Sequence, residues 1–363
     1  MSRNEVKNTG FPLSRSESLT IAGSLVLGVL AGLLTLLQAN AVLIFVVAGA
    51  ALALLAALVG QATDQLGTRL GSGATGVLQS ALGNLPELFV GIFALRAGLV
   101  SVVQAALVGS ILGNSLFVLG LAFFVGGLRH GTQRFASETP RRIANLVLLS
   151  VAALIIPTLT AQLHTPAAGH EEVLSIACAV ILLVVFIASI PSSLQGEPTK
   201  LSKEQAVSAH SWPIALTLVV LVGAGVGSAF VSDWFVSALT PAITFLHISP
   251  AFTGLVIVAL AGNAVENVVG IQFAARNQSD LAISVILNSS LQVALFLIPV
   301  LVLLSLFLGG AQLTLVLAPL LVVALALAAI LTTTIIYDGE SNWLEGLALV
   351  GLYAIIAISF WWG

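Results

Sequence analysis

The sequence predicts an all-α polytopic membrane protein of about eleven transmembrane helices: one leading helix and two inverted-topology repeats of five. Three observations lead to this fold class. Of the 363 residues, 58% are hydrophobic and only 7% are charged, whereas soluble domains carry about 25% charged residues. The apolar runs are long and continuous, which excludes a β-barrel because its strands alternate apolar and polar residues. A ten-residue motif also occurs twice, in corresponding spans.

The same composition excludes several functional classes. A chain with so few charged residues cannot cover the surface of a soluble enzyme. The single cysteine, Cys178, cannot form an internal disulfide, and the net charge of -3 offers no basic field for nucleic acid. The expected partners are therefore the lipid bilayer and inorganic cations, and nucleic acid is excluded.

Eleven stretches are apolar enough to cross the membrane, since a span needs about 20 mostly apolar residues. All five tryptophans fall at the ends of these stretches, where amphipathic rings meet the membrane interface. The predicted spans are Leu19–Leu37, Ala41–Gly60, Ala74–Ala97, Leu99–Gly126, Ile143–Leu163, Val173–Ile190, Trp212–Val231, Pro250–Ala275, Asp280–Phe307, Leu313–Tyr337 and Trp343–Trp362.

The distribution of Lys and Arg predicts the orientation. With a cytoplasmic N-terminus, eleven of the 12 basic residues fall on the cytoplasmic side and only Arg96 falls outside. An odd number of spans then places the C-terminus outside. We expect an integral protein of a prokaryotic inner (cytoplasmic) membrane.

The most polar stretch between spans divides the chain into parts. Residues 1–40 form the N-terminal tail and leading helix, and residues 41–190 form the first five-helix repeat. Residues 191–211 form a cytoplasmic linker, and residues 212–363 form the second repeat. Because five is odd, the two repeats enter the membrane from opposite sides, an arrangement common in secondary transporters.

A motif in the third and eighth spans supports the repeat. Gly83–Ile92 and Gly262–Ile271 share Gly, Asn, Glu, Val, Gly and Ile at the same relative positions. Continuing the same alignment without a gap places Ser110 on Ser289. The shared G-N-x-x-E is hard to attribute to chance, because carboxylates within membrane spans are rare.

Glu87 and Glu266 are the only acidic residues well inside predicted spans. A charged group at the centre of the membrane costs about 2.5–3.5 kcal/mol on insertion scales. No Lys or Arg lies in the interior of a span, so mobile protons or metal cations must neutralise the two carboxylates. The alternative is that each glutamate braces a neighbouring helix.

The neighbours of the two glutamates favour a hard cation. Asn84 and Asn263 lie one turn before each glutamate, on the same helix face. Gly83 and Pro86 weaken the helix, because Gly is flexible and Pro lacks the amide donor, and a break there would free backbone carbonyls as ligands. Carboxylate, amide and carbonyl oxygens suit Ca²⁺, which takes 6–8 oxygen ligands. The expected transported species are Ca²⁺ and H⁺, with no resident cofactor.

Further polar residues in these spans and the following ones are expected to line the same site. The fourth and ninth spans also carry small residues three or four positions apart. Close helix packing alone would explain the glycines, but it does not explain the amide side chains. The surrounding candidates are Gln79, Ser110, Asn114, Asn267, Asn288, Ser289, Ser290 and Gln292.

The two blocks Gly83–Gly120 and Gly262–Pro299 resemble the paired ion-selecting repeats of the calcium/cation–proton exchanger family, within the cation/Ca²⁺ exchanger superfamily. The resemblance covers nearly the whole chain. It implies that Glu87 and Glu266 bind Ca²⁺ and protons in alternation, with nearby carbonyls from Gly83. It implies that the backbone of Gly262 also offers a carbonyl, and that the leading span is peripheral.

Two positions depart from the family pattern. The second block usually reads G-N-A-x-E-H, and here the last position is Asn267. Where the family usually has Gly-Ser-Ser, this chain has Asn288-Ser289-Ser290. An amide cannot titrate as an imidazole does, so cation choice and pH response are open.

The leading hypothesis is a secondary antiporter that exports Ca²⁺, or a related cation, in exchange for H⁺ by alternating access. A Na⁺-driven Ca²⁺ exchanger or a monovalent cation/H⁺ antiporter is the alternative. An ion channel is disfavoured by the inverted repeat. An intramembrane enzyme would need a nucleophile near a base, and the spans contain none. The sequence leaves the oligomeric state open.

Overall fold

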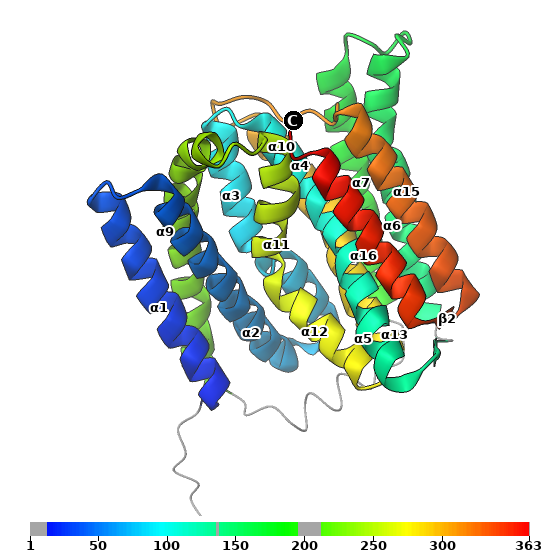
Figure 1. The fold of residues 1–363 in the computed structure, drawn as a ribbon, viewed down its shortest axis with the longest axis horizontal. Coiled ribbons are helices and arrows are strands. Elements are labelled where there is room, and N and C mark those ends of the chain that lie inside the picture. Colours follow the sequence, from blue (N-terminus) through cyan, green and yellow to red (C-terminus); the bar gives the residue numbers. More distant parts are fainter. Residues whose placement is uncertain (1–12, 136–137, 195–211, 363) are drawn as a thin grey trace, which may run out of the picture.

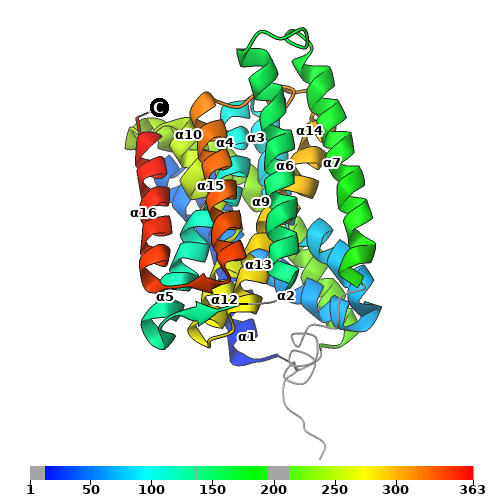
Figure 2. The same cartoon turned by 90° about the vertical axis from the view of Figure 1, so that its right-hand side faces the viewer.

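The computed structural model describes residues 13–135, 138–194 and 212–362. Long helices run side by side in a bundle, and the described part of the chain starts and ends at opposite ends of it (Figures 1 and 2). The helical hairpin of α6 and α7 extends beyond the other helices at the end where α16 finishes. The predicted all-helical class is confirmed.

The first half of the chain contains seven α-helices, one π-helical turn and a short strand among the described residues. Their bounds are α1 (Arg15–Leu36), α2 (Ala41–Leu82), α3 (Leu85–Arg96), α4 (Val100–Leu112), η1 (Gly113–Val118), α5 (Leu119–His130), β1 (Gln133–Arg134), α6 (Glu138–Gln162) and α7 (Glu171–Leu194).

The second half contains a similar series of helices, with two π-helical turns. Their bounds are α9 (Ile214–Leu246), α10 (Pro250–Phe252), η2 (Thr253–Val258), α11 (Ala259–Gly262), α12 (Ala264–Ala275), α13 (Ser279–Gln292), η3 (Val293–Leu297), α14 (Ile298–Ser305), α15 (Pro319–Asp338), β2 (Glu340–Ser341) and α16 (Trp343–Ser359).

Within the described residues, 8 helical segments are long and apolar enough to cross a membrane. The number is 9 if the bent pair Pro250–Gly262 and Asn267–Ala275 is one span, and Trp343–Ser359 is a shorter apolar helix. The chain is therefore an integral membrane protein. The count of eleven spans stays a prediction.

Three predicted boundaries are wrong. Residues 61–73, expected between two spans, are helical, because α2 continues through its polar residues to Leu82. Helix α9 continues past the predicted end at Val231 to Leu246. Residues 313–318, expected in the tenth span, are not helical, because α15 begins only at Pro319, whose fixed φ suits a helix start.

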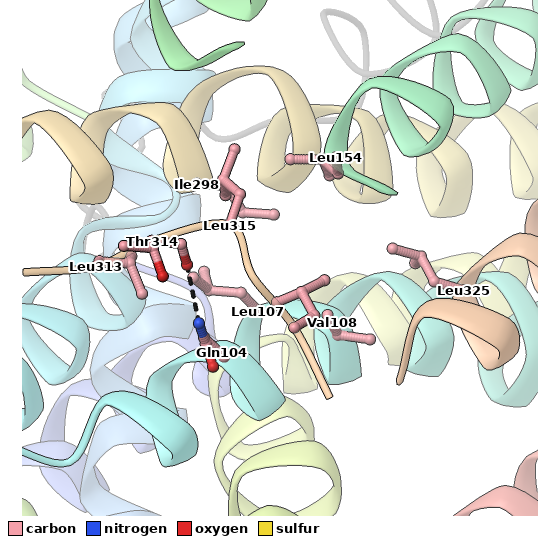
Figure 3. A pocket seen from close by; sticks show the side chains of 10 residues that line it. Gln104, Leu107, Val108, Leu154, Ile298, Leu313, Thr314, Leu315 and Leu325 are labelled. Carbon is pink, nitrogen blue, oxygen red and sulfur yellow. Dashed lines mark hydrogen bonds between the residues drawn. The ribbon is translucent and has the colours of Figure 1, made fainter. Parts of the chain in front are cut away.

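Residues 311–318 form an extended segment, called here the strap, between α14 and α15 (Figure 3). Burial alternates along it, with Leu313, Leu315 and Leu317 buried. Four side chains bond its backbone N–H and C=O groups at 2.8–3.0 Å, since an unpaired backbone group is costly in an apolar setting. They are Gln104, Thr158, Ser175 and Ser305.

The alignment of the two motif copies also relates helix boundaries. Helix α3 begins at 85 and ends at 96, and its counterpart α12 begins at 264 and ends at 275. Helices α4 and α13 begin at the matched positions 100 and 279, and α5 and α14 begin at 119 and 298. A π-helical turn precedes both α5 and α14. The two blocks therefore fold with the same local breaks.

A short two-stranded sheet joins the two halves at one end of the bundle. Strands β1 and β2 are antiparallel, with Gln133 opposite Ser341 and Arg134 opposite Glu340. Arg134 and Glu340 form an exposed ion pair at 3.0 Å. Helix α5 lies against α16 beside this sheet (Figure 2), so segments that are distant in sequence hold the two halves together here.

Candidate cation site

The two copies of the motif each sit at a break between helices. Asn84 precedes α3 and Asn263 precedes α12, and both have φ −95° and ψ 18°. Neither side chain caps the helix that follows. The two helices around the second break are bent by 65°. Identical backbone angles at matched positions show that the repeated motif specifies the same break twice.

The glutamates lie in the first turns of the helices after the breaks. Glu87 is in the first turn of α3, and the backbone of Glu266 is in the first turn of α12. The first N–H groups of a helix have no intrahelical partner and carry partial positive charge. The start of each helix within the bundle therefore favours a carboxylate in its first turn, where Glu87 and Glu266 lie.

Glu87 lies directly against the break of the other copy. A Cβ atom built on Gly262 would be 2.7 Å from both Cγ and Oε1 of Glu87. A real Cβ could not occupy that position without moving the glutamate. Glycine at 262 therefore lets the carboxylate of one half reach the backbone of the other half.

Asn263 is the centre of a hydrogen-bonded cluster and is only 2% exposed. Its amide nitrogen donates to Ser110 Oγ at 3.1 Å and to the Ala259 carbonyl at 3.0 Å. Its amide oxygen accepts from Ser289 Oγ at 3.1 Å, and Ser289 Oγ accepts from the Asn114 amide at 2.9 Å. The structure thus brings together four predicted residues from both halves.

Two further pairs cross between the halves. The Asn84 amide donates to Gln292 Oε1 at 3.2 Å, and the hydroxyls of Ser115 and Ser290 are 3.3 Å apart. Ser115 is 1% exposed and was not predicted from the sequence. Its position directly after Asn114 was the available signal.

The remaining predicted residues either lie outside the described hydrogen-bonded cluster around Asn263 or have side chains that the structure does not describe. Gly83 lies between α2 and the break, and Asn288 on α13 is not among the side chains that the described hydrogen bonds bring together. The side chains of Gln79 and Glu266 lie outside the described residues. The Asn267 amide oxygen is buried and has no hydrogen-bond partner in the described part of the chain.

Close backbone contact between α4 and η2 positions Ser110 beside Asn263. A Cβ on Gly109 would overlap the backbone of Leu255, and one on Gly254 would overlap Val102 and come within 2.9 Å of Ala105. Small residues allow helices to approach closely in membranes. The glycines therefore serve packing, as the alternative interpretation proposed, and the packing in turn assembles the polar cluster.

Chemically, the site gathers carboxylate, amide and hydroxyl oxygens inside the bundle. These are the ligands of hard cations. A carboxylate here can also bind a proton in place of a cation.

Comparison with known proteins identifies the family of the chain. The family model described as "Sodium/calcium exchanger protein" matches residues 40–193 and 216–362. The chain belongs to this family. A Ca²⁺/H⁺ antiporter of Synechocystis sp. is 35% identical over 344 residues, covering 87% of this chain and 90% of the relative.

Two solved structures have the same fold. Native YfkE matches with a TM-score of 0.80 and 30% identity, covering 94% of this chain and 99% of that chain. The structure called "H+/Ca2+ Exchanger CAX" matches with a TM-score of 0.75 and 16% identity, covering 96% and 92%. The resemblance to the calcium/cation–proton exchangers is confirmed.

Proposed function

We propose that the protein is a secondary antiporter that exports Ca²⁺, or a related cation, in exchange for H⁺. The observation that carries this is the placement of Glu87 against Gly262, because it puts the acid of one repeated motif at the helix break of the other. The Synechocystis relative, named a Ca²⁺/H⁺ antiporter, supports the same chemistry.

The exchange follows from competition for the same oxygens. Ionised Glu87 and Glu266 carry two negative charges that balance one divalent cation, with neutral oxygens from Asn84, Asn263 and the freed carbonyls near Gly83 and Gly262 completing the shell. Protonation removes the charge, so the cation leaves and the protons occupy the carboxylates. Because a bare carboxylate is costly in the membrane, the empty ionised site is disfavoured. That cost couples the two fluxes.

The inverted repeat would provide alternating access. Helix starts at matched positions of the two blocks and the two separate stretches of family similarity support two repeats, residues 41–190 and 212–363. We propose that residues 1–40 form a peripheral leading segment and 191–211 a cytoplasmic linker. We place the N-terminus in the cytoplasm and the C-terminus outside, in a prokaryotic inner membrane, because this orientation puts nearly all Lys and Arg inside.

The test is exchange in proteoliposomes that contain a pH-sensitive dye. A Ca²⁺ gradient should drive proton movement with the natural protein, and Glu87→Gln should reduce it to the level of empty liposomes. Gln keeps the shape of Glu but cannot bind a proton or carry charge. Glu138→Gln is the matched control, because Glu138 is an exposed residue at the start of α6.

Two further measurements in the same proteoliposomes distinguish antiport from the other transport mechanisms. Ca²⁺ uptake that requires Na⁺ and moves no protons would instead support a Na⁺-driven exchanger. Ca²⁺ current that continues without a counter-ion would support a channel. Unchanged proton movement in Glu87→Gln would overturn the mechanism.

A further inference from the structure

A groove of about 630 Å³ lies between α1 and α9, with α2 as its floor. Its lining is apolar apart from Ser24 and the indole N–H of Trp234. The Ser24 hydroxyl already donates to the Ile21 carbonyl at 2.9 Å within its own helix. An ionic or hydrated ligand would therefore lose most of its water without polar side chains to replace it.

Glycines lie on both walls of the groove. A Cβ on Gly223 of α9 would meet no heavy atom within 4 Å, and one on Gly28 of α1 would lie 3.9 Å from Val231. Farther along, the Trp234 ring comes within 2.7 Å of a Cβ built on Gly32. The indole therefore closes the groove between the two helices at that end.

The groove opens toward the hydrocarbon of the bilayer. Both walls are candidate spans, and only 11% of the α1 window and 28% of the α9 window are buried in the protein. The walls continue into exposed apolar side chains, with Leu25 63%, Val219 69% and Phe230 60% exposed. In the ribbon, α1 stands at the edge of the bundle beside α9 (Figure 1). What meets this surface is lipid.

We propose that the groove binds one acyl chain of a bilayer phospholipid. A helix is about 10–12 Å in diameter, too wide to enter between walls that approach as closely as Gly28 and Val231. A helix of a second copy therefore could not lie between α1 and α9 at this point. A single hydrocarbon chain is flexible, narrow and wholly apolar, and it matches the lining throughout.

The bound chain would stabilise α1 against α9. Lipid and groove are equally apolar, so the gain comes from van der Waals contact that an unfilled gap forfeits. Ordinary bilayer lipid exchanges freely, whereas a chain held by three helices should remain through purification. The proposal does not depend on calcium exchange, since no transport step enters it.

The experiment is native mass spectrometry of the purified protein, delipidated in detergent and then given phosphatidylcholine with 16-carbon chains. The natural protein should retain one phospholipid. Gly223→Leu and Gly28→Leu place a side chain in the groove from opposite walls, so each should retain none. Gly351→Leu is the matched control, because a Cβ there also meets nothing within 4 Å but lies on α16, away from the groove.

A second readout is thermal unfolding. Added phosphatidylcholine should raise the Tm of the natural protein and of Gly351→Leu, because a ligand that binds only the folded state stabilises it. The two groove variants should not respond. Retention of phospholipid by both groove variants, or its loss from Gly351→Leu, would overturn the proposal. So would a dimer that Gly223→Leu dissociates, because a second copy would then be the occupant.

Discussion

The two helix breaks of the site have the same backbone and different side-chain chemistry. At matched positions, Leu88 of the first copy corresponds to Asn267 of the second. One span later, Gly113-Asn114 corresponds to Gln292-Val293, so the amide shifts by one position. The repeated backbone thus sets the positions from which oxygen ligands can reach the site. The side chains at those positions differ between the two copies and determine which oxygens are available.

The hydrogen bonds follow this difference. Asn263 is bonded to both Ser110 and Ser289, one residue from each half. The described bond of Asn84 to another side chain is to Gln292. The second break is therefore held by side chains of both halves, and the four variants below compare the two breaks in order of expected effect.

The largest effect is expected from Gly262→Ala. The added Cβ would lie 2.7 Å from both Cγ and Oε1 of Glu87, so it would displace the carboxylate from the break. We expect proton-coupled Ca²⁺ uptake in proteoliposomes to fall to background. Gly60→Ala is the control, since its Cβ meets nothing within 4 Å. Normal uptake by Gly262→Ala would show that the contact across the halves is dispensable.

A smaller effect is expected from removing the asparagine amides. Asn263→Ala leaves Ser110 and Ser289 short of partners in a buried place, which costs about 1–3 kcal/mol for each unsatisfied group. Asn84→Ala removes the bond to Gln292, which is half-buried rather than buried, so the amide left without this bond is nearer to solvent. We expect a lower Tm for Asn263→Ala than for Asn84→Ala in detergent. Equal Tm values would mean that the two breaks are held equally.

The smallest effect on folding, and a change in pH response, is expected from Asn267→His. An imidazole has an unperturbed pKa of about 6.5, so it gains charge in the physiological range where an amide cannot. A protonated ring beside Glu266 in sequence would oppose cation binding. The apparent Ca²⁺ affinity of the variant should therefore fall more steeply than that of the natural protein as pH drops from 8 to 6. Parallel profiles would show that position 267 does not act on the site.

Much of the site could be predicted from the sequence because its motif is repeated. The repeated motif contains both Glu87 and Glu266, and the rarity of carboxylates inside spans marked both as candidates. The pairs that cross the halves could not be predicted. Asn84 and Gln292 are 208 residues apart, and only tertiary packing decides which amide meets which partner.

The helix boundaries show a second limit. Hydropathy marks where a helix is apolar, not where it ends, so the polar continuation of α2 beyond residue 60 was interpreted as a connection. Conversely, the strap is mostly apolar and was expected in a span, yet it is extended. Its conformation depends on Gln104, Thr158 and Ser175, whose bonds to it span 140 residues or more of sequence.

The strap has a consequence for how the chain is made. Its backbone groups are satisfied by side chains that lie on α4, α6, α7 and α14, all of which precede it in sequence. During synthesis α4, α6 and α7 can be inserted before the strap leaves the ribosome, and α14 directly precedes it in the chain. The strap can then close onto an existing framework, which spares it a period of unpaired backbone in lipid. The order of the chain therefore also affects how the protein is assembled. In a circular permutant that made the strap first, its backbone groups would lack these partners until the helices followed.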